Sequence, residues 1–209
     1  MSKTVVLLGD SIIDNAPYIA AGELDVAGQL RELLPDWQVD KRALDGSICA
    51  DVIDQQLADP IPEGALIVLS TGGNDALGEI DLLLSPAPVT NAEAMIELRR
   101  LREKFRDEYV PVMDRLVGYD RPILVLTIYN PRFELEDAPE GLQEAAEGAL
   151  SAFNDVIQQE ALRHGADILD TRILCADASD FANPIEPSAK GGQKIAKGIS
   201  AWLSSISPQ

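Results

Sequence analysis

Three short polar turns in this sequence carry residue types that together could attack a carbonyl carbon. They follow the first, second and third buried apolar runs of the chain and contain Ser11, Gly46 and Asn74. A serine hydroxyl is a nucleophile, and a backbone N–H and an asparagine amide are donors that stabilise negative charge developing on oxygen. Each turn alone is an ordinary loop sequence. It is their succession after consecutive strands that indicates a nucleophile with an oxyanion hole.

The elements that must position these turns follow from the apolar pattern. Runs rich in Val, Ile and Leu without strict alternation are typical of strands covered on both faces of a parallel sheet. Segments with helical periodicity lie between them, and this alternation predicts a doubly wound α/β sheet. In a sheet with the strand order 2-1-3-4-5, the ends of the first three strands are adjacent, so the three turns can converge. The five predicted strands are Val5–Leu8, Val39–Leu44, Leu66–Ser70, Ile123–Ile128 and Asp167–Leu169.

Length and charge exclude several classes of protein. A chain of 209 residues with no internal repeat and no Gly, Ser or Pro linker predicts one domain over 1–209. There are 35 acidic and 17 basic residues, a net charge of −18, so this acidic protein should bind neither nucleic acid nor an anionic membrane. The sequence has no apolar run of membrane-spanning length and no apparent signal peptide, and we therefore expect a cytoplasmic protein.

Motifs along nearly the whole chain resemble the SGNH, or GDSL-type, hydrolase superfamily. GDS at 9–11 is similar to the first motif, with Ile12 in place of the usual leucine, and GGND at 72–75 is similar to the third. Gly46 matches the glycine of the second motif. The resemblance implies a three-layer α/β/α flavodoxin-like fold and hydrolysis of a small-molecule ester through an acyl-enzyme on Ser11. It also implies an oxyanion hole from the Ser11 N–H, the Gly46 N–H and the Asn74 amide, with no metal or organic cofactor.

The last motif departs from the family pattern at two catalytic positions. The family has an aspartate and, three residues later, a histidine before Pro-Ser, whereas this chain has Asn183 and Glu186. Glu186 is the candidate general base, although a free glutamate, with a pKa of about 4.3, is a weaker base than imidazole. Burial or nearby acids would raise its pKa. The acids expected nearby are Asp14, Asp75, Asp177 and Asp180, and the Asn183 amide is expected to orient the carboxylate.

The single histidine, His164, is an unsuitable replacement for the missing base. It precedes the fifth strand and therefore lies at the amino edge of the sheet, whereas Ser11 lies at the carboxyl edge. A strand of about five residues separates these edges by roughly 15 Å. The two cysteines, Cys49 and Cys175, follow strands at opposite sides of the sheet, so we expect free thiols rather than a disulfide.

Two functions remain open from the sequence. The first is a serine hydrolase that acts on a carboxylic ester or an acetyl group, with Ser11, Glu186 and Asn183 as catalytic residues. Asp75, Asp14 and Tyr129 are candidates for substrate binding. The alternative is a catalytically inactive module that keeps the pocket and binds a small acyl or carbohydrate ligand. The sequence makes no prediction about the oligomeric state.

Overall fold

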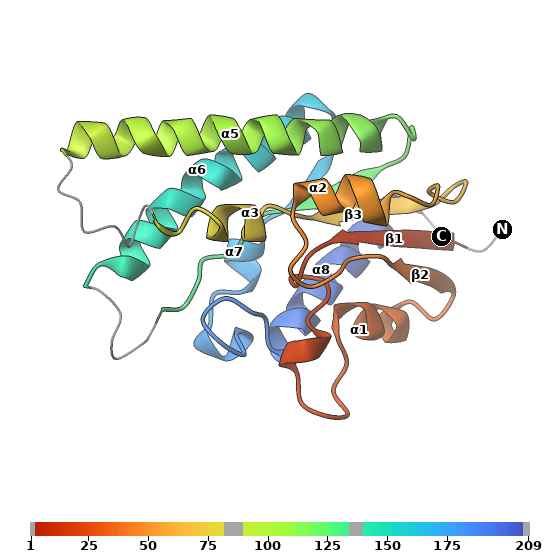
Figure 1. Ribbon diagram of the computed structural model, residues 1–209. Coiled ribbons are helices and arrows are strands. Elements are labelled where there is room, and N and C mark those ends of the chain that lie inside the picture. The colour runs from red at the N-terminus through yellow and green to blue at the C-terminus, as the bar shows by residue number, and fades with distance from the viewer. Residues whose placement is uncertain (1–2, 82–89, 134–139, 207–209) are drawn as a thin grey trace.

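Five parallel strands form one sheet in the order β2-β1-β3-β4-β5, which confirms the predicted α/β topology. The computed structural model describes residues 3–81, 90–133 and 140–206 (Figure 1). The strands are β1 (Lys3–Gly9), β2 (Trp37–Lys41), β3 (Leu66–Ser70), β4 (Ile123–Leu126) and β5 (Asp167–Leu169).

Two strands end earlier than their apolar runs predict. The second ends at Lys41 because the N–H groups of both Arg42 and Ala43 donate to the Leu7 carbonyl at 2.9 Å, which breaks the regular ladder. The fourth ends at Leu126 because a side chain replaces the neighbouring strand as the partner of Ile128. Both backbone groups of that residue are hydrogen-bonded to the Asn154 amide at 2.8 Å.

Helices cover both faces of the sheet and complete three layers. One core contains the inward faces of α2, α5 and α6, and the other contains those of α1 and α8. Figure 1 shows α5 and α6 crossing each other on one side of the strands, with α1 and α8 on the opposite side. The helices are α1 (Val26–Leu33), α2 (Cys49–Asp51), α3 (Gly73–Leu77), α5 (Asn91–Val117), α6 (Leu142–Arg163), α7 (Thr171–Leu174) and α8 (Ala189–Ile206).

The longest helix begins where the sequence places a capping signal. Thr90 accepts the Glu93 N–H at 3.2 Å, and the Glu93 carboxylate accepts the Thr90 N–H at 2.8 Å. The amino-terminal parts of α5 and α6 extend beyond the carboxyl edge of the sheet (Figure 1).

Among the described residues, none of the helices has the length and apolar character that a membrane crossing requires.

The register of the strands brings the carboxyl ends of β1, β2 and β3 close together at one edge of the sheet. Gly9 of β1 lies opposite Ser70 of β3, and Leu7 of β1 lies opposite Lys41 of β2. The turns that contain Ser11, Gly46 and Asn74 therefore begin from neighbouring strand ends.

Candidate active site

The turn that carries Ser11 is held tightly at the end of β1. Gly9 has φ +127°, and a Cβ at this position would lie 1.6 Å from the Ser70 carbonyl oxygen, so only glycine fits. The backbone groups of Gly9 are bonded to the Gln56 amide at 2.7 and 2.8 Å. Ile13 and Asp14 then donate their N–H groups to the Asp10 carbonyl, forming a helical turn around Ser11. The result is a buried serine held at the edge of the sheet.

The two other turns are connected to the serine turn by hydrogen bonds. Asn74 Nδ2 donates to the Ser47 carbonyl at 3.0 Å, and Gln56 bridges the Ser47 hydroxyl and Gly9. Gly46 has φ +80°, and no described heavy atom lies within 4 Å of the place where its Cβ would be. Within the described part of the chain, the N–H groups of Ser11 and Gly46 donate to no backbone carbonyl. These donors are therefore available to an incoming oxyanion.

Glu186 enters the site from the loop before α8, as the sequence predicts. The loop is closed by a bridge between Phe181 and Pro187 and by Asn15, whose side chain donates to the Pro187 carbonyl at 3.2 Å. Glu186 is buried, and its Oε2 has no hydrogen-bond partner among the described residues. Burial raises the pKa of this carboxyl, the neighbouring Ser11 side chain opposes the rise, and the Asp45 charge adds to it.

The acids expected to act on Glu186 lie elsewhere. Asp177 and Asp180 accept from Lys194 Nζ at 3.0 and 2.6 Å, because the loop turns them toward α8. Asp45 is the acid that raises the pKa of Glu186, and the Tyr18 hydroxyl donates to Asp45 Oδ2 at 2.8 Å.

Asn183 contacts the Glu186 backbone in place of the expected contact with its carboxylate. The Asn183 Oδ1 atom accepts the N–H groups of both Ile185 and Glu186 at 3.0 Å. Asn183 is itself exposed. It therefore shapes the turn that presents Glu186, because an asparagine side chain readily closes such a turn on its own backbone.

The three predicted substrate-binding residues have different surroundings. Tyr129 lines the pocket beside Ser11, and its hydroxyl donates to the Ile185 carbonyl at 2.7 Å. Asp75 accepts the Cys49 N–H at 3.2 and 3.3 Å and so joins α3 to α2. Asp14 pairs with Lys41 at 2.5 Å and accepts the Asp45 N–H at 3.1 Å, which fixes the turn that carries Gly46. Both aspartates are engaged by the protein itself.

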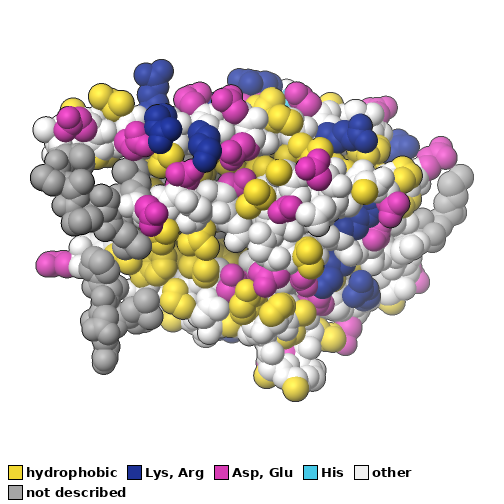
Figure 2. All heavy atoms as spheres, in the orientation of Figure 1, with side chains coloured by type: hydrophobic (Ala, Val, Ile, Leu, Met, Phe, Trp, Pro, Cys, Tyr) yellow, Lys and Arg dark blue, Asp and Glu magenta, His cyan; other side chains and the backbone are white. Residues whose placement is uncertain are grey.

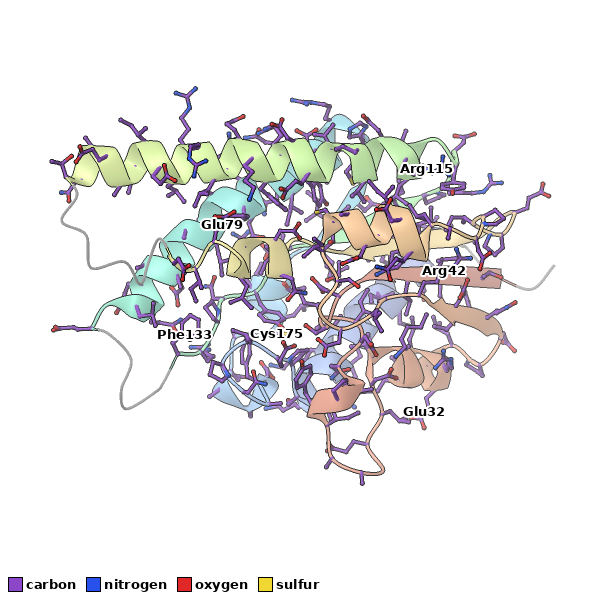
Figure 3. The ribbon with its side chains drawn as sticks, in the orientation of Figure 1. Glu32, Arg42, Glu79, Arg115, Phe133 and Cys175 are labelled. Carbon is purple, nitrogen blue, oxygen red and sulfur yellow. The ribbon has the colours of Figure 1, made fainter. Side chains whose placement is uncertain are left out.

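An apolar pocket of about 110 Å³ opens beside Ser11, Asn74 and Glu186. Its walls come from α3, α5, α6 and the segment after β4. Figure 2 shows hydrophobic side chains gathered in this region, below α5 and next to the residues drawn in grey. Figure 3 labels two lining residues, Glu79 after α3 and Phe133 after β4.

His164 and the cysteines take no part in this arrangement. His164 caps α6 and lies 3.6 Å from Asp114 and 3.8 Å from Glu160. Cys49 and Cys175 are buried free thiols, and burial raises the pKa of each. In the ranges that the structure describes, no cluster of three or more His, Cys, Asp or Glu side chains could hold a metal ion.

A protein-family model identifies the family of this chain. The model for the GDSL-like Lipase/Acylhydrolase family matches residues 7–194, which contain all three turns and the Glu186 loop. The chain belongs to this GDSL-like family of ester hydrolases. A search of curated protein sequences gives no match.

Solved structures share the fold of this GDSL-like protein over nearly its whole length. Phospholipase A1 from Streptomyces albidoflavus NA297 is 20% identical with a TM-score of 0.67, covering 99% of this chain and 100% of that one. The acetyl xylan esterase AlAXEase is 16% identical with a TM-score of 0.69, covering 96% and 99%. The lipase Lip_vut3 from a goat rumen metagenome is 16% identical with a TM-score of 0.72, covering 95% and 96%.

Sequence reasoning missed one acid of the GDSL-like site, Asp10. Its Oδ1 accepts the Ile12 N–H at 3.1 Å and the Ser70 hydroxyl at 3.0 Å. Asp10 lines the same pocket as Ser11. Burial raises its pKa to about 7 despite these bonds, and the charges of Asp75 and Glu186 add to the rise. The available signal was its place directly after a fully apolar strand, where a carboxyl is buried with the strand end.

Proposed function

We propose that this GDSL-like hydrolase cleaves carboxylic esters through an acyl-enzyme on Ser11, with Glu186 as the general base. The observation that carries the proposal is that Ser11 and the buried Glu186 line the same pocket, near enough for the serine side chain to oppose the rise in the pKa of the carboxyl. A base must lie within hydrogen-bond reach of the proton that it removes. His164, at the carboxyl-terminal end of α6, lies near Asp114 and Glu160 instead.

The reaction follows from the placement of these groups. Ser11 Oγ attacks the ester carbonyl carbon while its proton passes to Glu186. The Ser11 N–H, the Gly46 N–H and the Asn74 amide stabilise the tetrahedral oxyanion. Glu186 returns the proton to the leaving alcohol, which leaves the acyl group on Ser11. Water then attacks this ester, again with Glu186 as base, and the carboxylic acid is released.

Burial compensates in part for the low basicity of a carboxylate. A base works best when its pKa lies near the operating pH, and an exposed glutamate lies well below neutrality. Removal from water raises the pKa of Glu186 toward that range, and the Asp45 charge acts in the same direction. Its Oε2 has no donor among the described residues that would stabilise the charged form.

The decisive experiment compares Glu186→Gln with Glu144→Gln on short-chain p-nitrophenyl esters. Glutamine keeps the shape of Glu186 but accepts no proton, so kcat should fall by about 10²–10⁴. Glu144 is an exposed residue in the first turn of α6, so the same substitution there is the matched control. Ser11→Ala should abolish turnover. Wild-type rates in Glu186→Gln would exclude this carboxylate as the base.

The double variant Asn183→Asp with Glu186→His tests the same assignment by introducing a histidine base at position 186. Aspartate retains an oxygen that can accept the N–H groups of Ile185 and Glu186, so the turn should keep its shape. We expect esterase activity with an imidazole-like pH dependence. If neither this variant nor the wild type hydrolyses any ester, the protein is a binding module for a small acyl or carbohydrate ligand.

A further inference from the structure

The apolar pocket beside Ser11 has a wall composition that suits one class of ligand. Leu98 and Leu101 come from α5, and Leu150 and Phe153 come from α6. Apart from Asp10 and Glu186, the only charged lining residue among those described is Glu79. Its carboxylate lies 2.5 Å from Lys104 Nζ and is therefore already neutralised.

We infer that this pocket binds the acyl chain of the ester and selects longer acyl chains over acetyl groups. The inference rests on the proposed function, because it takes Ser11 as the point of attachment. Ser11, Asn74 and Glu186 line this pocket together with its apolar side chains, so the acyl group of an ester held at Ser11 would contact apolar wall. A phosphate or sugar in its place would find no free cation and few donors among the described lining residues.

Outside the lining of the apolar pocket, the surroundings of Glu186 are polar and acidic, which favours one orientation of the ester. Asp45 and Tyr18 are hydrogen-bonded to each other near Glu186, and Gly46 is exposed beside them. Acids repel an anionic leaving group, whereas a neutral alcohol can hydrogen-bond there. An acyl chain in the apolar pocket and an uncharged alcohol at the acidic side satisfy both surfaces.

Burial of the acyl chain predicts that kcat/KM rises steeply with the length of that chain. Each methylene group removed from water contributes about fourfold to binding, and this contribution passes into kcat/KM. From acetate to hexanoate the chain gains four methylenes, so kcat/KM should rise by about 10² for p-nitrophenyl esters. The rise should stop where the chain reaches the end of the pocket.

The test is to shorten the pocket from its α6 wall. Ala149 lines the pocket, whereas Ala201 lies exposed on α8 in the opposite layer and is the matched control. Ala149→Phe should lower the octanoate-to-acetate ratio of kcat/KM at least tenfold, and Ala201→Phe should leave that ratio unchanged. If Ala149→Phe does not fold, as judged by circular dichroism, Ala149→Leu should lower the ratio by a smaller factor. A ratio that favours acetate in the wild type, or one unaffected by Ala149→Phe, would overturn the inference.

A binding measurement separates this inference from the proposed mechanism. Calorimetric titration of Ser11→Ala with sodium octanoate and sodium acetate reports on the pocket without catalysis. Octanoate should bind at least tenfold more tightly than acetate, and Ala149→Phe should remove this difference. If octanoate binds in this way but Ser11→Ala still hydrolyses esters at the wild-type rate, the pocket inference stands and the proposed mechanism falls. If hydrolysis depends on Ser11 but octanoate binds no better than acetate, the mechanism stands and the pocket inference falls.

Discussion

The raised pKa of Asp10 makes a measurable prediction about stability. Burial raises the pKa of this carboxyl from 3.8 to about 7, so the folded protein holds the proton more tightly than the unfolded chain does. A group with a raised folded pKa contributes stability that is fully present below its unfolded pKa. That stability is lost as the pH rises through its folded pKa. We therefore expect Asp10 to lower the free energy of unfolding between about pH 4 and pH 7.

The magnitude follows from the size of the shift. About three pKa units at about 1.4 kcal/mol each correspond to about 4 kcal/mol in total. Of this, about 3 kcal/mol should be lost between pH 4.5 and pH 8, because the unfolded carboxyl is already partly ionised at the lower pH. Asn in place of Asp10 keeps an oxygen that can accept from Ile12 and Ser70 but carries no charge. Asp10→Asn should therefore lack this part of the pH dependence.

The assay is urea unfolding of the wild type and Asp10→Asn at pH 4.5, 6 and 8, followed by circular dichroism. The stability of Asp10→Asn relative to the wild type should increase by about 3 kcal/mol from pH 4.5 to pH 8. Asp36→Asn, at an exposed position, is the control and should show no such trend. A difference between wild type and Asp10→Asn that stays constant within about 0.5 kcal/mol across this range would refute the reasoning.

Three further predictions concern catalysis. His164→Gln should leave kcat/KM within a few-fold of wild type in an ester hydrolysis assay; a hundredfold loss would place the base at the other edge of the sheet. Asn74→Ala should lower kcat by about 10²–10³ with little change in KM, because its amide would act on the oxyanion. The wild-type kcat/KM should rise with pH through the raised pKa of Glu186, since only the ionised carboxylate accepts a proton; a profile that is flat from pH 4 to pH 8 would contradict this assignment.

The fold was predictable because most of the apolar runs contain almost no polar residues and their order along the chain is informative. β3 and β4 are buried along their whole length. Strands of four or five apolar residues are buried on both faces when helices cover both sides of a parallel sheet. The strand ends were less predictable because they depend on contacts from distant residues. Asn154 ends β4 from α6, and nothing near Ile128 in the sequence indicates this contact.

The placement of Ser11, Asn74 and Glu186 around one pocket was also predictable, because turn position follows directly from strand order. The partners of the nearby acidic residues could not be predicted. Asp14 and Asp75 each follow a strand, as Ser11 does, yet a lysine and a backbone N–H engage them. Which acid remains available depends on partners that are 26 or 27 residues distant in the sequence. The walls of the acyl pocket depend likewise on how α5 and α6 cross.

The structure changes the physical reason for pairing a glutamate with an asparagine in the last motif. Charge compatibility suggests that Asn183 is neutral to avoid repelling Glu186, but Asn183 is exposed and acts on the loop backbone. Two other acids interact with Glu186: the buried Asp10, whose pKa the Glu186 charge helps to raise, and the half-buried Asp45, which raises the pKa of Glu186. Below about pH 7, Asp10 holds its proton, which leaves less negative charge facing the developing oxyanion. In the mechanism that we propose, burial of Asp10 therefore lets the Glu186 base and the oxyanion hole operate side by side, because one of the neighbouring acids remains neutral.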